Sequence, residues 1–237
     1  SAWYQATLIN SLLVYSTRES ERSILLMLAI AHQEKKKHVV VKTNWNYRLS
    51  CEYDKSVPDF IELLRSGETR VSRFILDDQL DIPIHEDGIV LNVITKRLDD
   101  QDWLDYKGMI NGIMGVGGDN TLSEAVSNPN TLPPLIFSQH RFKQDSYCKL
   151  IDRAYLLPAD LKGKELLIEF LTLSRDYAYW MKPSDYANNL STIIAGRQEE
   201  LRFAWSHLSR ELSDFCELNS FLIPWLNSNI LLAESAP

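Results

Sequence analysis

The chain has 237 residues, 45% of them hydrophobic and 24% charged, a composition typical of globular proteins that excludes extensive disorder. Its formal net charge of −7 at pH 7 disfavours nucleic acid as a partner, because proteins that bind nucleic acid usually carry a basic field. No stretch approaches the roughly 20 apolar residues of a membrane span, and the sequence shows no signal peptide, so we expect no membrane span.

The first predicted strand covers residues 12–15 and ends at Ser16, and the spacing of apolar residues over 24–31 predicts a helix after it. A basic run at residues 35–38 marks the end of this helix, where cations complement the helix dipole. The alternative is that this run forms a local site for an anionic ligand.

Strand-like and helix-like segments continue to alternate as far as residue 160. This order predicts parallel βαβ units with right-handed crossovers. We expect further strands at residues 39–41, 73–76, 89–94, 113–116 and 135–137, with helices at 58–67 and from residue 99 to 109.

The character of the sequence changes after Pro158, where only helix-like segments follow. We therefore predict a Rossmann-like α/β domain over residues 1–160, with a parallel sheet flanked by helices, and a helical C-terminal extension over residues 161–237 that packs on it. The helices of the extension are expected at 165–173, 184–194 and 198–215. In the last of them the predicted buried residues are Leu201, Phe203, Ala204, Leu208, Leu212 and Phe215.

Three cysteines, Cys51, Cys148 and Cys216, are far apart and odd in number. Their spacing matches neither a metal site nor a disulfide framework. We therefore predict a protein without metal in a reducing compartment, the cytoplasm.

The most informative segment is the glycine-rich run at residues 115–125, which follows a predicted strand and opens a predicted helix. Gly117 and Gly118 let the backbone approach a ligand closely. The amides beyond them lie at a helix N-terminus, where unpaired N–H donors and the helix dipole favour an anion. Asn120 and Thr121 add side-chain donors. The alternative is purely structural: Thr121 through Glu124 also fits a capping box, with Thr121 as N-cap.

This run resembles the donor-site motif in the C-terminal domain of GT-B-fold glycosyltransferases, roughly His-Gly-Gly-x-Asn-Ser/Thr-x-x-Glu-Ala. The matching residues are Gly117, Gly118, Asn120, Thr121, Glu124 and Ala125. The resemblance implies that the run from Gly117 through Asp119 to Thr121 grips the diphosphate of a nucleotide-sugar and that Glu124 binds the ribose. Val116 stands where many members of the family have His.

The resemblance also assigns further ligand contacts on other loops. A loop after the first strand would contact phosphate, and here that loop contains Ser16, Thr17 and Arg18. Lys96 and Arg97 follow the strand that usually provides backbone contacts to the base. The Asp-Gln pair that the family often has after the next strand is not in place. Gln139 and His140 are the candidates for sugar contacts in that region.

The implied function is transfer of a sugar from a nucleotide-diphosphate donor to an unknown acceptor, without a cofactor or a metal. Catalytic residues are not identified, because the resemblance covers only a donor-binding domain. A complete enzyme of this kind has a second, N-terminal acceptor domain, which we expect to be missing from this chain.

Two other readings of the glycine-rich run stay open. Gly117-Gly118-Asp119 with Thr121 also resembles the Gly-Gly-Asp-Gly-Thr turn of diacylglycerol and NAD kinases, although Asn120 replaces the last glycine before the Thr. That reading implies a phosphotransferase. The third reading is a non-catalytic binding or scaffold module that keeps the GT-B-like fold.

Overall fold

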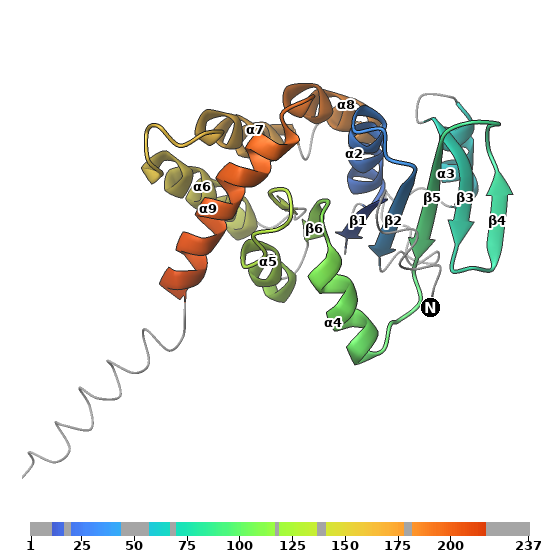
Figure 1. The fold of residues 1–237 in the computed structure, drawn as a ribbon, viewed down its shortest axis with the longest axis horizontal. Coiled ribbons are helices and arrows are strands. Elements are labelled where there is room, and N and C mark those ends of the chain that lie inside the picture. Colours follow the sequence, from blue (N-terminus) through green and yellow to red (C-terminus); the bar gives the residue numbers. More distant parts are fainter. Residues whose placement is uncertain are drawn as a thin grey trace, which may run out of the picture.

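The computed structural model describes residues 11–16, 20–43, 57–66, 70–116, 119–136, 141–177 and 182–216. They form the predicted α/β fold, a mostly parallel, Rossmann-like sheet flanked by helices and followed by a helical C-terminal extension (Figure 1).

The described residues contain one seven-stranded sheet with the order β4-β3-β5-β2-β1-β6-β7. All neighbouring strands are parallel except β3 and β4, which pair antiparallel. Each predicted strand is present, and β4 is an additional one that the sequence analysis missed. The strands are β1 (Ser11–Ser16), β2 (His38–Thr43), β3 (Val71–Leu76), β4 (Leu80–Pro83), β5 (Ile89–Ile94), β6 (Met114–Val116) and β7 (Leu135–Ile136).

The inner strands are mostly apolar because helices cover them on both faces. Val39, Val41, Leu91 and Val93 are completely buried in β2 and β5. In contrast, β4 lies at the sheet edge and is almost entirely exposed. It therefore lacks the apolar pattern from which the other strands were predicted.

Eight helices lie in the described ranges. The predicted helices of the first half are confirmed, whereas α6 is a helix that the sequence analysis missed. Their bounds are α2 (Ser20–Gln33), α3 (Val57–Arg65), α4 (Asp100–Met109), α5 (Asp119–Val126), α6 (Arg141–Leu156), α7 (Lys164–Tyr177), α8 (Pro183–Ile194) and α9 (Gln198–Cys216). None of these helices combines the length and the apolar character needed to cross a bilayer.

The strand order reverses direction at β1. From β1 the chain passes through α2 to β2 on one side, and from β5 it crosses back through α4 to β6 on the other side of β1. Since parallel crossovers are right-handed, these two crossovers place α2 and α4 on opposite faces of the sheet. The sheet thus has a topological switch point between β1 and β6.

Two polar side chains attach neighbouring segments to β1. Asn111 accepts a hydrogen bond from the Leu13 amide at 2.8 Å and donates to the Ser11 carbonyl at 3.1 Å, beyond the short pairing of β1 with β6. On α4, the hydroxyl of the fully buried Tyr106 donates to the Val14 carbonyl at 2.7 Å and accepts from the Lys42 amide at 3.1 Å. These bonds fix α4 over β1 and β2.

The helices of the C-terminal extension pack on the rest of the molecule and share its hydrophobic core. Helix α8 packs along α2, and α7 packs against α6, α8 and α9. Helix α9 is bonded to the end of α5: Trp205 Nε1 donates to the Asn128 carbonyl at 3.3 Å, and Ser209 Oγ donates to the Val126 carbonyl at 2.7 Å. The core therefore includes residues from both predicted ranges, 1–160 and 161–237.

Candidate functional site at the carboxyl edge of the sheet

The candidate site lies where β1 and β6 end. Ser16, the last residue of β1, is in register with Gly115 of β6, so the two parallel strands finish side by side. Ligands of open α/β sheets bind outside the carboxyl ends of the strands, at the point where the strand order reverses. The loop predicted to contact phosphate and the glycine-rich turn therefore leave the sheet from adjacent strands at its switch point.

Two helices begin shortly beyond these strand ends. Helix α2 begins at Ser20, four residues after the end of β1, and α5 begins at Asp119, three residues after the end of β6. The short βα connections place both helix N-termini at the same edge, where their amides favour an anion.

The start of α5 decides one of the alternatives raised by the sequence. Asp119 is already helical, and Asn120 and Thr121 lie in the first turn. The interpretation of Thr121 as N-cap of a capping box is therefore wrong, because an N-cap residue precedes the first helical residue. The two glycines Gly117 and Gly118 lie outside the described residues, and so do the side chains of Asp119, Asn120 and Thr121.

Glu124, the predicted ribose contact, forms an ion pair with Lys107 of α4, with 3.1 Å between Nζ and Oε1. The same ammonium lies 5.3 Å from the centre of the Trp103 ring. The carboxylate is 41% exposed, so the pair connects α4 with α5 without enclosing the acidic group.

Lys96 and Arg97 follow β5, which is separated from β1 by β2. The Lys96 ammonium lies 3.7 Å from the Asp78 carboxylate, and both side chains are more than half exposed. Arg97 is also exposed. Both cations therefore lie at the carboxyl edge but not beside the end of β1.

Asp77 ties the ends of β3 and β5 together. Its carboxylate accepts hydrogen bonds from the Thr95 amide at 2.6 Å, from the Lys96 amide at 3.0 Å and from the Thr95 hydroxyl. Burial by itself would raise the pKa of Asp77, but these donors outweigh it and the pKa is lowered. Asp77 is in the left-handed region with φ 52°, which aspartate tolerates better than most residues.

Lys42 is a polar residue of this edge that the sequence analysis missed. It is the penultimate residue of β2, it is only 5% exposed, and its ammonium donates to the Thr43 carbonyl at 2.9 Å. Burial lowers the pKa of Lys42, and the charge of Asp77 partly opposes this shift. A buried lysine of lowered pKa at the carboxyl edge of the sheet is a candidate functional group. In the sequence Lys42 directly follows three valines of a predicted buried strand, and this position could have indicated that the lysine is buried.

Asn92 of β5 points to the same face of the sheet as Lys42. It is in register with Val40, two residues before Lys42 on β2. Asn92 is buried, and its Oδ1 has no hydrogen-bond partner among the described residues. Buried amide oxygens usually have a partner, so this acceptor is a further polar group available near the carboxyl edge.

Other predicted contacts lie outside the described residues, namely Thr17, Arg18, Gln139 and His140, as does the side chain of Ser16. Where the structure does describe side chains, no cluster of His, Cys, Asp or Glu could hold a metal ion.

No protein-family model matches this chain, and no curated protein matches it at a significant level.

Proposed function

We propose that this chain binds a nucleotide-diphosphate sugar at the carboxyl edge of the sheet and serves as the donor half of a glycosyltransferase. The observation that supports this most strongly is the reversal of strand order between β1 and β6, with Ser16 and Gly115 in register. It puts the motif that resembles a glycosyltransferase donor site at the position where α/β sheets bind ligands.

The chemistry of this edge suits a diphosphate. The start of α5 offers backbone donors to the phosphate oxygens, and Lys42 offers a cation next to β1 in a chain that is acidic as a whole. In sugar transfer these groups would stabilise the leaving diphosphate as its negative charge develops. We place the activity in the cytoplasm, in keeping with the wide spacing and odd number of the cysteines.

Titration calorimetry with UDP, GDP and a UDP-sugar tests this proposal. We expect Thr121→Ala to weaken diphosphate binding about tenfold, since it removes one donor to a phosphate oxygen, and to leave the melting temperature within a few degrees of wild type. Thr192→Ala on α8 is the matched control, because Thr192 is an exposed helical threonine of the extension.

The same titration separates the alternative functions. Tight binding of ATP with no response to UDP or GDP would favour a kinase-like phosphotransferase. No binding of any nucleotide by the folded chain would contradict both enzyme classes and leave a scaffold module.

A further inference from the structure

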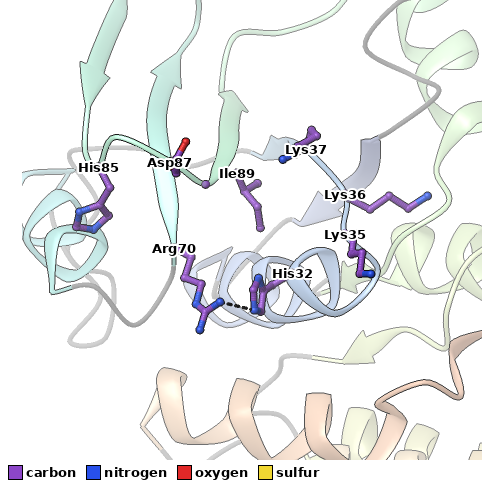
Figure 2. A pocket seen from close by; sticks show the side chains of 9 residues that line it. His32, Lys35, Lys36, Lys37, Arg70, His85, Asp87 and Ile89 are labelled. Atoms are coloured by element: carbon purple, nitrogen blue, oxygen red, sulfur yellow. Dashed lines mark hydrogen bonds between the residues drawn. The ribbon is translucent and has the colours of Figure 1, made fainter.

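A second site lies at the opposite edge of the sheet, where the strands begin. A pocket of about 630 Å³ opens there between the end of α2 and the starts of β3 and β5 (Figure 2). Its volume is within the range of small-molecule sites, roughly 300–1,000 Å³. The lining residues are His32, Lys35, Lys36, Lys37, Arg70, His85, Asp87, Gly88 and Ile89.

The turn that ends α2 brings the lysines to this pocket. Lys35 is in the left-handed region with φ 55°, and the Lys36 amide donates to the Ala31 carbonyl at 2.8 Å. This hydrogen-bonded turn reverses the chain before β2 begins at His38. The lysines therefore do follow a helix C-terminus, as predicted, and they also contribute to a cavity.

Arg70 is held in place by a close backbone approach. The Ile89 amide donates to the Arg70 carbonyl at 2.9 Å, and a Cβ atom on Gly88 would lie 2.1 Å from that carbonyl oxygen. Gly88 has φ 145° and Arg70 has φ 49°. Only glycine fits at position 88, so the starts of β3 and β5 are locked together at the pocket.

The guanidinium of Arg70 is hydrogen-bonded to a histidine ring. Its Nη1 donates to Nε2 of His32 at 2.8 Å, which orients the group without bringing a carboxylate to it. The remaining N–H donors keep the fork geometry that suits a phosphate group. In Figure 2, Arg70 and His32 point toward each other along one side of the pocket, and the Lys37 side chain extends toward Ile89.

The pocket has four permanent cations and a single carboxylate, Asp87, in a chain of net charge −7. Lys36 lies 4.0 Å from Glu34 and points away from the middle of the pocket (Figure 2). Among the described residues, no carboxylate lies within ion-pair distance of Lys35, Lys37 or Arg70. This concentration of uncompensated charge favours an anion that carries several negative charges.

A smaller pocket of about 280 Å³ adjoins the first and shares His32 and Arg70 with it. It lies between α2, α3 and α8 and is lined by both apolar and neutral polar side chains, including Leu63, Asn188 and Ser191. Arg70 thus stands between a cationic compartment and a largely uncharged one. This pair of compartments suits a ligand with a phosphorylated part and an uncharged part.

We propose that the basic pocket at the amino edge of the sheet binds a small polyphosphorylated ligand, with Arg70 and Lys37 as its main phosphate contacts. The site does not depend on the proposed donor site, because it uses none of its residues and lies at the other edge of the sheet. The phosphate groups belong either to a free metabolite or to a phosphorylated lipid headgroup.

Calorimetry with inorganic tripolyphosphate and binding to vesicles that contain 5% phosphatidylinositol bisphosphate distinguish these two sources. We expect Arg70→Ala combined with Lys37→Ala to weaken binding at least tenfold, and higher salt to weaken wild-type binding. Lys149→Ala removes an exposed lysine of α6 and should bind as wild type does. Lys37→Met alone, at an exposed position, is a milder variant should the double variant unfold.

Binding of tripolyphosphate alone identifies a free ligand, and binding of vesicles alone identifies a headgroup. The proposal is overturned if wild type binds neither probe, or if the folded Lys37 and Arg70 variants bind as tightly as wild type. UDP affinity is measured in the same variants. The affinity for UDP should not change in the Lys37 and Arg70 variants, and the Thr121→Ala variant should still bind tripolyphosphate. Failure of the basic-pocket proposal would therefore leave the donor-site proposal standing.

Discussion

Lys42 shows how a single residue bears on both stability and function. Its ammonium is buried at the end of β2, where desolvation opposes the charged form. Replacing a buried charge with an apolar side chain of similar volume is often neutral or stabilising. A lysine at such a position therefore suggests a role for its charge.

We predict that Lys42→Met preserves the free energy of unfolding or raises it by about 1 kcal/mol, and lowers the affinity for a nucleotide diphosphate about tenfold. Because the folded pKa is lowered, the unfolded state binds more protons between that pKa and about 10.4, so wild-type stability rises with pH there. The variant should lack this rise. Urea denaturation at several alkaline pH values measures it, and a destabilised variant with unchanged affinity would contradict the prediction.

Asp77 gives a dependence on pH of the same sign as Lys42, but in the acidic range. Its folded pKa is lowered, so its contribution to stability is complete above the unfolded value of about 3.9 and is lost as pH falls through the folded pKa. We expect Asp77→Asn, which tolerates the same left-handed backbone, to lose less stability than wild type on acidification. Urea midpoints at pH 6 and at pH 3 give the comparison, and equal losses would show that Asp77 does not contribute.

At the scale of elements, the phenol of Tyr106 attaches α4 to the sheet. Tyr106 is fully buried, and its hydroxyl bridges β1 and β2 through Val14 and Lys42. Removing that hydroxyl leaves a buried amide and a buried carbonyl with one partner fewer, which costs full desolvation of those groups.

We therefore predict that Tyr106→Phe lowers the free energy of unfolding by about 1–3 kcal/mol. Tyr155→Phe provides the control, since Tyr155 is 60% exposed at the end of α6 and should change stability little. Chemical denaturation of both variants gives the difference. Equal stability of the two variants would show that the bridge is not important.

The sequence predicted helices and strands well where they have one clear apolar pattern. It predicted burial poorly where the packing of neighbouring elements determines which residues are covered. In α9, Leu201, Ala204 and Leu208 are buried as expected, whereas Phe203 is 45% exposed. Trp205 is fully buried although it was not expected to be. The buried residues 201, 204, 205 and 208 are three or four positions apart from one turn to the next and therefore share one face of the helix. Phe203 is hydrophobic, but its position in the helix lies outside this face.

At the scale of the whole molecule, the order of the strands in the sheet could not be predicted from sequence patterns. Nothing local in Ile89–Ile94 indicates that β5 inserts between β2 and β3, because that position depends on contacts between distant segments. The glycine-rich turn was recognisable, whereas the burial of Lys42 and the gathering of Arg70 with Lys37 depend on the tertiary fold.

Because one core extends through both predicted ranges, we expect the chain to unfold in a single cooperative transition. Trp205 is bonded across the contact of α9 with α5, and it is one of six tryptophans, so fluorescence of a variant that keeps Trp205 as its single tryptophan reports the extension. Circular dichroism reports all helices. Coincident urea midpoints from the two probes are expected, and separate midpoints would indicate that the extension unfolds independently.

The exposed strand β4 has a consequence for self-association. It closes one side of the sheet with Pro83, which lacks an amide hydrogen, and with the charged pair of Arg73 and Asp81 beside it. An incoming strand from another molecule would meet a missing donor and a charged pair, both of which discourage intermolecular β-pairing. This margin of the sheet is thereby protected from aggregation, even though its backbone is open to water.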